Sequence, residues 1–349
     1  RFSSRVIEES LDSPEREKAL AFVEKLYKRS GIQSRSCAMP DLMKEDAADF
    51  EFFPPNWRLD PPPTTEDIMA LYEKISVDLG EQASRQALEE AGIDPEDVTH
   101  LVFCTCTGFF APGPDILLGM RLGLAPTVQR TIIGFMGCYA GFNGMRTADQ
   151  IVRSDPRAVV LQVSLELCII HWQVRDGLEA LVGNCLFADG CGATVYGAAE
   201  RNSGKGLVDL RANYCTVAND SLDQMRWQVG STGFEFYLSP EVPNTLGRDA
   251  QPFVEALLDE AAVSREEVSD WVVHPGGRKI VEAVRDALDL DDSDVEHAFG
   301  VLRDHGNMSS ATIFFVLDRH LRNHNRNGAM VALGFGPGLT VEGAILDRC

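Results

Sequence analysis

The sequence predicts an α/β protein made of two similar halves. Short apolar runs rich in β-branched residues alternate along the chain with longer amphipathic runs, and this alternation is typical of α/β folds. Each half also contains a short strand pattern that ends in a polar residue at a glycine-rich turn, Cys138 in the first half and His274 in the second. The 349 residues suffice for two such units, which we place at residues 1–206 and 207–349.

The first half is predicted to open with helices and to continue as alternating strands and helices. Helical spacing of apolar residues covers 14–29 and 65–91, and the second run stops at Gly92, a residue favoured at helix ends. The elements that follow are strand 100–107, helix 115–123, strand 128–135, helix 139–153, strand 158–167 and strand 191–197. Residues 158–167 are nearly all apolar, as a strand covered on both faces requires.

The second half repeats this style. Its predicted elements are helix 251–262, strand 270–273, helix 277–288, helix 309–322 and strands 329–335 and 340–346. The last two strands form a hairpin across Gly336-Pro337-Gly338. We therefore expect two α/β halves that face each other.

Composition and charge exclude several classes of protein. The formal net charge is −21, from 53 acidic and 32 basic residues, whereas nucleic-acid binding needs a basic surface. No apolar run reaches the roughly 18 residues of a membrane span, and we expect no secretory signal. The chain opens at Arg1 rather than at a methionine, as a trimmed N-terminus would. These features predict a protein that binds no nucleic acid and has no membrane span.

The chain has nine cysteines, an odd number, and most of them lie in apolar strand-like runs. This usage favours free thiols in a reducing cytoplasm over a disulfide framework. The pair Cys104 and Cys106 has a spacing that suggests metal ligands, but alternation along a strand directs the two sulfurs to opposite faces. The histidines lack the spacing of a zinc site, so we expect no metal.

Cys138 is the candidate nucleophile. It lies in the turn between a predicted strand and a predicted helix, where Gly134, Gly137 and Gly141 permit a tight change of direction. A thiol at a helix N-terminus is expected to have a lowered pKa and more thiolate at neutral pH. The alternative is a small buried residue that packs the turn, because a free cysteine often behaves as a small hydrophobe.

Two more segments place polar side chains where sites on α/β sheets gather. His274 directly follows a strand, and Asn307 lies just before a helix. A histidine beside Cys138 would complete an activated thiol, as an imidazolium–thiolate pair, and an asparagine amide would add a donor for a developing oxyanion. Taken alone, His274 is equally well a core histidine, and Asn307 a turn residue or helix cap. His171, after another strand, lines a cavity or belongs to the core.

Several strings of sequence carry a family resemblance. They are Gly134–Ala140, Leu181–Gly183, Leu186–Gly190, His274–Gly277, Gly306–Ser310 and Gly334–Glu342. In this order they resemble the chalcone synthase-like type III polyketide synthases, and the resemblance runs from about Lys25 to the C-terminus. It implies the thiolase fold, an αβαβα arrangement of layers made of two similar halves, and a homodimer.

The resemblance also implies a reaction. Cys138 would attack an acyl-CoA starter and hold the growing chain as a thioester, and His274 would keep the sulfur as thiolate. His274 and Asn307 would bind the carbonyl of malonyl-CoA and stabilise the enolate that forms when CO₂ leaves. The enolate would attack the acyl group on Cys138 and add two carbons. The family needs no metal or redox cofactor for this chemistry.

The resemblance assigns further positions around the tunnel that leads to the nucleophile. Phe187 and Phe236 match two gatekeeping aromatic residues, although without the family both would be read as core aromatics. Lys25 and Arg29 match two of three basic contacts to CoA, and the segment with Gly276 and Gly277 is also assigned to CoA. The third basic position holds Phe22, a departure for which Arg35 is a candidate replacement.

Cavity residues separate this chain from plant chalcone synthases. The positions that differ are Cys106, Ala111, Cys168 and His171. The pattern is closer to bacterial members that make alkylpyrones and alkylresorcinols from long fatty acyl-CoAs. Cysteine and alanine leave an apolar wall with room for an alkyl chain, so we expect a fatty acyl starter. The alternative is a tetrahydroxynaphthalene-type synthase that uses malonyl-CoA alone.

Ring closure is the last step that the resemblance addresses. Aldol closure in the family is associated with a hydrogen-bonded set of a hydroxyl, a glutamate and a serine. Glu166 and Ser309 are present, but Cys106 stands in place of the hydroxyl and is a weaker donor. We therefore expect lactonisation to an alkylpyrone rather than aldol closure to an alkylresorcinol.

Two rival functions remain open. A ketoacyl-ACP synthase III-type enzyme shares the fold and the Cys-His-Asn set, but the strings His274–Gly277 and Gly334–Gly338 favour the polyketide synthases. An inactive homologue that serves as a scaffold is disfavoured because all three catalytic candidates are present. In the family the subunits of the homodimer meet at loop 109–114, which contains Ala111.

Overall fold

Two four-stranded sheets form the centre of the molecule, one from each half. The computed structural model describes residues 2–173, 180–199, 206–323 and 328–349. The first sheet contains β1 (His100–Thr105), β2 (Gln129–Gly134), β3 (Val159–Leu167) and β4 (Asp189–Gly197) in the order β2-β1-β3-β4. The second contains β5 (Val208–Val217), β8 (Val268–Val273), β9 (Ala329–Gly336) and β10 (Thr340–Arg348) in the order β5-β10-β9-β8.

Each sheet mixes parallel and antiparallel pairs. In the first, β1 lies parallel to β2 and β3, and β4 runs antiparallel to β3. In the second, β8 and β9 are parallel, and β10 runs antiparallel to both β9 and β5. Every residue of β3 is buried, which confirms the prediction of a strand covered on both faces.

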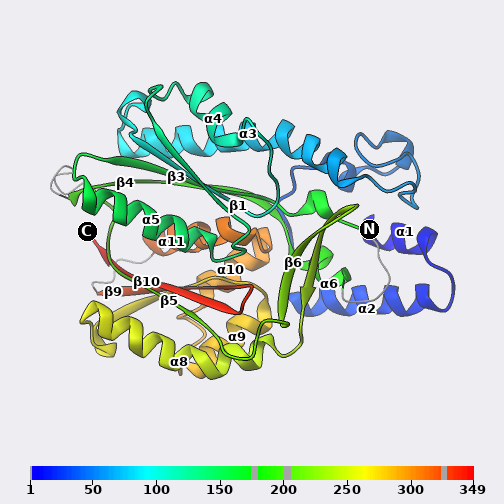
Figure 1. The fold of residues 1–349 in the computed structure, drawn as a ribbon. Helices are drawn as coiled ribbons and strands as arrows, with labels where there is room; N and C mark the ends of the chain where they lie inside the picture. Colours follow the sequence, from blue (N-terminus) through cyan, green and yellow to red (C-terminus); the bar gives the residue numbers. More distant parts are fainter. Residues whose placement is uncertain (1, 174–179, 200–205, 324–327) are drawn as a thin grey trace.

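Helices cover both faces of each sheet, so the layers follow the order α-β-α-β-α (Figure 1). The outer layer on the first sheet consists of α3 (Thr65–Ala91) and α4 (Pro114–Leu122), and that on the second of α8 (Val242–Ala261) and α9 (Arg278–Ala287). The layer between the sheets contains α5 (Ala140–Ser154) and α11 (Thr312–Asn323), with α10 (Glu296–His305) beside them. An apolar cluster fills this central layer with residues of both halves, among them Phe142, Met145, Val272 and Met330.

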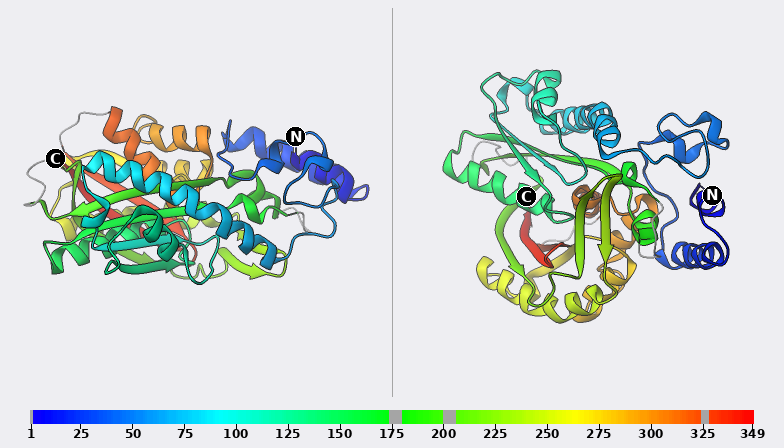
Figure 2. Two further views of the ribbon diagram at one scale, coloured as in Figure 1. Left: turned by 90° about the horizontal axis from the view of Figure 1, so that it is seen from above. Right: turned by 45° about the vertical axis from the view of Figure 1, so that its right-hand side comes forward.

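The remaining elements gather at one end of the layers (Figure 2). They are α1 (Phe2–Ser10), α2 (Glu15–Ser30), α6 (Ala180–Leu186) and a separate hairpin of β6 (Met225–Gly230) and β7 (Gly233–Leu238). Short 3₁₀ helices connect other elements, at Pro40–Met43, Ala47–Asp49, Pro95–Asp97, Ile169–His171, Arg265–Glu267 and Ser309–Ala311. Among the residues described, no helix is long and apolar enough to cross a bilayer.

The predicted elements are all present, but their ends and number differ. Helix α8 begins at Val242, well before the predicted residue 251, and it continues through Pro252, a residue that usually interrupts a helix. Our sequence analysis did not predict α1, α6, α10, β5, β6 or β7. The division at residue 206 stays a prediction, although the strands of the first sheet end at Gly197 and those of the second begin at Val208.

Candidate active site

Cys138 lies in the turn between β2 and α5, as predicted, and is 9% exposed. Gly137 makes this turn possible, because its φ is +82° and a Cβ there would lie 2.5 Å from Cδ of Pro337. A Cβ on Gly141, in the first turn of α5, would lie 2.8 Å from the carbonyl oxygen of Ser310. The nucleophile turn is therefore pressed against the second half of the chain.

Asn307 and Ser309 reach Cys138 from the second half. Both form side-chain hydrogen bonds with the Cys138 thiol, and these bonds lower its pKa. The Asn307 amide also donates to the carbonyl of Gly276 at 3.1 Å, and its oxygen accepts the Ser309 N–H at 2.9 Å. Asn307 is 2% exposed. The structure thus brings together two of the three catalytic candidates.

His274 follows β8 and is fully buried. Its backbone N–H donates to the carbonyl of Leu333 at 2.8 Å, which fixes it beside β9. Farther along the same strand, a Cβ on Gly336 would lie 3.4 Å from the Cys138 nitrogen. Neither ring nitrogen of His274 has a hydrogen-bond partner in the part of the chain that the structure describes. Strand β9 therefore lies next to both the histidine and the nucleophile turn.

The expected thiolate is not what this environment favours. Burial raises the pKa of Cys138 to about 11, despite its hydrogen bonds with Ser309 and Asn307. Burial lowers the pKa of His274 to about 3. The prediction of a lowered thiol pKa is wrong, because a helix N-terminus stabilises an anion by only about 0.3–1 kcal/mol, whereas full burial shifts a pKa by up to about 3–5 units. Both groups are neutral at pH 7.

Glu166 is the centre of a buried hydrogen-bond network beside the nucleophile. Its carboxylate accepts the Cys106 N–H at 3.0 Å, the Thr107 hydroxyl at 2.9 Å and the Ser310 hydroxyl at 2.5 Å. The Cys106 thiol lies 3.4 Å from the carboxylate and 3.5 Å from the Ser309 hydroxyl. Burial raises the pKa of Glu166, and these donors oppose the shift.

This network differs from the predicted set of Cys106, Glu166 and Ser309 in two respects. No hydrogen bond joins Ser309 directly to Glu166 among the described residues; the Cys106 thiol lies between them. Thr107 and Ser310, which bind the carboxylate directly, were missed, although each is the immediate neighbour of a predicted residue. Cys168 is buried nearby, and burial raises its pKa well above the ordinary value.

The two gatekeeper candidates lie against each other. The ring centroids of Phe187 and Phe236 are 4.7 Å apart at 86°. Trp227, which the sequence analysis missed, pairs with Phe236 across the β6–β7 hairpin and donates its indole N–H to the carbonyl of Cys106 at 2.6 Å. It therefore joins the gatekeeper pair to the Cys106 wall.

His171 is held in one tautomer. Its Nδ1 accepts the N–H of Phe234 at 3.0 Å, so Nε2 carries the hydrogen and donates to the carbonyl of Thr107 at 2.7 Å. Burial lowers the pKa of His171 to about 4. The ring also stacks on Phe234 with centroids 4.2 Å apart. These contacts make His171 part of the wall that carries the β6–β7 hairpin.

The candidate CoA contacts occupy a different region. Lys25 and Arg29 are exposed on α2, and Phe22 packs into an apolar cluster with α6. The guanidinium of Arg35 donates to the carbonyls of Asn184 and Phe187 and to the Tyr27 hydroxyl, and its role as a replacement cation stays a prediction. Ala111 is exposed in the loop that was expected at a subunit boundary.

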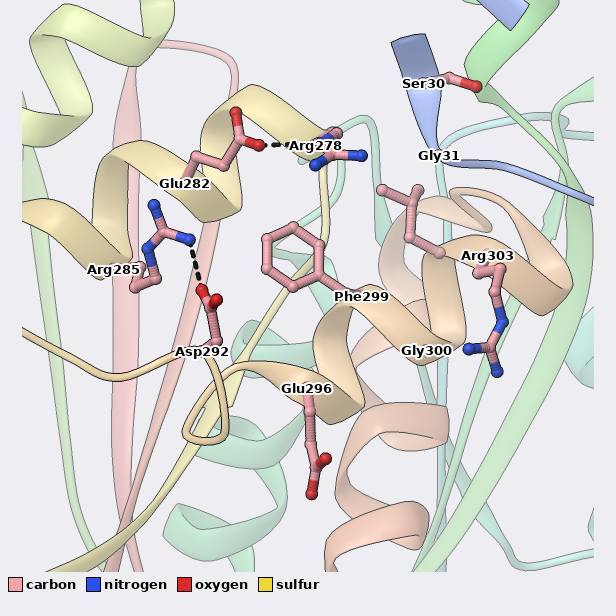
Figure 3. A pocket seen from close by; sticks show the side chains of 11 residues that line it. Ser30, Gly31, Arg278, Glu282, Arg285, Asp292, Glu296, Phe299, Gly300 and Arg303 are labelled. Atoms are coloured by element: carbon pink, nitrogen blue, oxygen red, sulfur yellow. Dashed lines mark hydrogen bonds and ion pairs between the residues drawn. The ribbon is translucent and has the colours of Figure 1, made fainter. Parts of the chain in front are cut away.

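A surface pocket lies between the end of α2, α9 and α10 (Figure 3). Its arginines are paired with carboxylates: Arg278 with Glu282 at 2.8 Å and Arg285 with Asp292 at 2.6 Å. None of the three catalytic candidates lines this pocket. No group of three or more histidine, cysteine, aspartate or glutamate residues suited to a metal ion occurs in the described ranges.

Paired halves in α-β-α-β-α layers, with a buried cysteine from one half and a buried histidine and asparagine from the other, define a thiolase-type condensing enzyme. Two family models match nearly the whole chain: "Chalcone and stilbene synthases, N-terminal domain" at residues 14–200 and "Chalcone and stilbene synthases, C-terminal domain" at 210–349. The chain belongs to the chalcone and stilbene synthase family and is a type III polyketide synthase, a transferase.

Known proteins similar to this chain are named as polyketide synthases. The "Alpha-pyrone synthesis polyketide synthase-like Pks18" of Mycobacterium tuberculosis is 31% identical over 350 residues, which are 99% of this chain and 86% of that protein. "Probable polyketide synthase 1" of Dictyostelium discoideum is 29% identical over 93% of this chain, which spans only 10% of that protein. The crystal structure of PKS-I from the brown alga Ectocarpus siliculosus has a TM-score of 0.90 at 30% identity and covers 100% of this chain and 93% of its own. The family and fold predictions are thereby confirmed.

Proposed function

We propose that this enzyme loads an acyl-CoA starter on Cys138, extends it with malonyl-CoA and cyclises the product. The observation that carries the proposal is the hydrogen-bonded contact of the Cys138 thiol with Asn307, whose amide is tied to Gly276, close to His274. The proposed nucleophile and the proposed oxyanion donor are thus neighbours at one buried point, which supports the reaction. The reaction needs both there, because one sulfur holds the chain while a neighbouring thioester becomes an enolate.

The chemistry divides into loading and extension. In loading, the Cys138 sulfur bonds to the acyl carbon, and the thiol proton leaves with the CoA sulfur. In extension, malonyl-CoA loses CO₂ and the electron pair of the broken C–C bond passes to the thioester oxygen as an enolate. The N–H groups of neutral His274 and Asn307 are the donors for that oxygen. Attack of the enolate carbon on the acyl group forms the new C–C bond and releases the Cys138 sulfur.

The starter we propose is a fatty acyl-CoA, and the product an alkylpyrone. The name of the mycobacterial relative, an alpha-pyrone synthase, supports the pyrone. The weak Cys106 donor between Ser309 and Glu166 supports it too, because aldol closure would need a stronger hydroxyl relay. Trp227 favours the second candidate, a synthase that uses malonyl-CoA alone. Its large indole lies beside Cys106, where a small side chain was expected to leave room for an alkyl chain.

We further propose a homodimer that acts in the cytoplasm. Strand β2 is an edge strand of its sheet, and exposed apolar side chains lie on it and beside it: Phe109, Met120, Ile132, Phe135 and Met136. An exposed apolar edge of this kind is suited to pairing with a second copy of the chain. Light scattering should give the mass of two chains, and the mass of one chain would contradict the dimer.

Mass spectrometry of reaction products tests the proposal. Purified enzyme is incubated with malonyl-CoA and starters from acetyl-CoA to long fatty acyl-CoAs, with Cys138→Ala as the control. Tri- or tetraketide pyrones that carry the fatty chain are expected. A single pentaketide from malonyl-CoA alone would establish the second candidate. Product that forms only with malonyl-ACP would replace both with a ketoacyl-ACP synthase-type reaction.

A further inference from the structure

Glu342 on β10 is a buried carboxylate to which the proposed reaction assigns no role. It is 1% exposed. One oxygen accepts a hydrogen bond from the Asn143 amide at 2.6 Å, and the other accepts one from the Arg146 guanidinium at 2.6 Å. Both partners belong to α5, the helix that starts just after Cys138. The contact therefore crosses from the second half of the chain to the nucleophile helix of the first.

The geometry of the contact restricts α5 in two directions. Asn143 and Arg146 are three residues apart, so they lie on the same face of the helix, one turn apart. A carboxylate that binds both side chains fixes the rotation of this face as well as its distance from β10. Bonds to a charged acceptor are short and directional, and they are strong because Glu342 lies out of water.

Neighbouring glycines let α5 lie directly on the sheet at this point. Glu342 pairs with Gly334 on β9, and a Cβ on Gly334 would lie 2.4 Å from the Phe142 ring. At the next such position along β9, a Cβ on Gly336 would lie 2.6 Å from the Tyr139 ring. Because these two glycines have no side chain, the start of α5 can lie directly on β9 and β10, and Glu342 fixes it there.

Strand β9 connects this contact to the histidine. Its residue Leu333 accepts the backbone N–H of His274 at 2.8 Å, next to Gly334, the partner of Glu342. The sheet that carries His274 is therefore the one to which Glu342 fastens the nucleophile helix. A shift of α5 along this sheet would change the distance between the sulfur and the C-terminal donors.

We propose that Glu342 is a positioning residue that holds Cys138 in register with His274 and Asn307 through Asn143 and Arg146. The inference rests on the proposed function for its kinetic consequence. The position of Cys138 relative to its neighbours can be tested without turnover. Glu342 does not touch the reacting atoms in this account; it acts through the first turns of α5. Misplacement of a reacting group by about 1 Å can cost about 10²-fold in rate.

The test is the isosteric variant Glu342→Gln, with Glu81→Gln as the matched control. Glu81 pairs with Arg85 and Arg121 at 2.8 Å on the outer layer of the first half, away from α5. We expect Glu342→Gln to lower kcat by about 10²-fold. The KM for malonyl-CoA should stay within about twofold of the parent value, because only interactions in the transition state are lost. Glu81→Gln should change neither kcat nor KM.

A second readout follows Cys138 without turnover. The pH–rate profile of its alkylation by iodoacetamide, measured at the Cys138 peptide, should move to higher pH in Glu342→Gln, because the hydrogen bonds with Ser309 and Asn307 that lower the thiol pKa weaken. If the parent enzyme makes no polyketide, the proposed function fails, but this profile still decides the positioning role.

Rescue separates positioning from general stability. The double variant Asn143→Asp with Glu342→Gln reverses the donor and acceptor and keeps one carboxylate next to Arg146, so it should restore most of the lost kcat. If Glu342→Gln does not fold, Arg146→Ala replaces it as the test of the same contact. The Arg146 side chain is 33% exposed, so its removal disturbs the core less. An unchanged kcat and alkylation profile in the single variants, or a loss of kcat that follows only the unfolded fraction and is not rescued, would overturn the proposal.

Discussion

The ends of β2 and β8 follow the same plan, yet they leave Cys138 and His274 in different surroundings. The Cys138 thiol has hydrogen bonds with Ser309 and Asn307 and lies beside the Glu166 network. The His274 ring has no hydrogen-bond partner within the described ranges, although it is fully buried. A buried polar group that is left unsatisfied calls for an explanation, and a substrate oxygen is the partner that the proposed reaction supplies. In the proposed reaction, the first half therefore supplies the nucleophile and the second half supplies the donors.

The largest effect that sharpens this comparison is expected at Asn307. Asn307→Ala removes the proposed donor for the enolate oxygen and a hydrogen bond with Cys138. Loss of one preorganised oxyanion donor costs about 10²–10³-fold in kcat. Steady-state kinetics of malonyl-CoA consumption measures the change. A loss of only a few-fold would show that the second half contributes no donor at this position.

Stability against acid distinguishes the buried histidines from exposed ones. Below pH 6.5 His274 is protonated in the unfolded chain but not in the folded chain, where its pKa is about 3. The unfolded state then binds more protons, so stability falls as the pH decreases from 6.5 towards 3. His274→Gln should reduce the loss of unfolding free energy between pH 7 and pH 5 by about 2 kcal/mol.

Urea unfolding at the two pH values measures this loss. His171→Gln, in the first half, should give a similar reduction, because burial lowers the pKa of His171 to about 4. An unchanged pH dependence in His274→Gln would mean that His274 is already charged in the folded protein. That result would support the imidazolium–thiolate pair expected from the sequence.

Trp227 offers a way to change product length while the catalytic groups stay in place. Its indole lies between the gatekeeper Phe236 and the Cys106 carbonyl, with ring centroids 6.3 Å apart and a hydrogen bond of 2.6 Å. Trp227→Ala should admit longer starters or add one or more extensions, as seen in product masses. Trp57→Ala, in the aromatic cluster around Phe2, is the control. The same product masses in parent and Trp227→Ala would show that the indole does not limit the chain.

The smallest effect is expected at Cys106. Cys106→Thr would strengthen the donor between Ser309 and Glu166 and should raise the proportion of resorcinol over pyrone. Chromatography of the two products measures the ratio. An unchanged ratio of resorcinol to pyrone would contradict the link between Cys106 and ring closure.

The fold could be predicted from the sequence because strands, helices and turns depend on local pattern, whereas the three catalytic positions rest on the family resemblance and stay predictions. Glycines around Cys138 permit the turn, and the apolar run of β3 predicts a buried strand. Thr107, Ser310 and Trp227 could not be placed, since their partners come from other segments: Glu166 for the first two, Cys106 for the third.

The pKa of Cys138 was predicted in the wrong direction for a related reason. The helix N-terminus is visible in the sequence, but the degree of burial depends on how the second half covers the turn. Glu342 illustrates the same limit. It belongs to a recognised string, yet its contact with Asn143 and Arg146 exists only once the two halves meet.

The most direct test of the division of labour measures CO₂ release and chain extension separately with labelled malonyl-CoA. If the second half holds the donors for decarboxylation, Cys138→Ala should still release CO₂ while it forms no extended product, and Asn307→Ala should do neither at more than a small fraction of the parent rate. Loss of CO₂ release in Cys138→Ala, with release retained in Asn307→Ala, would contradict the assignment of the nucleophile to one half and the enolate donors to the other.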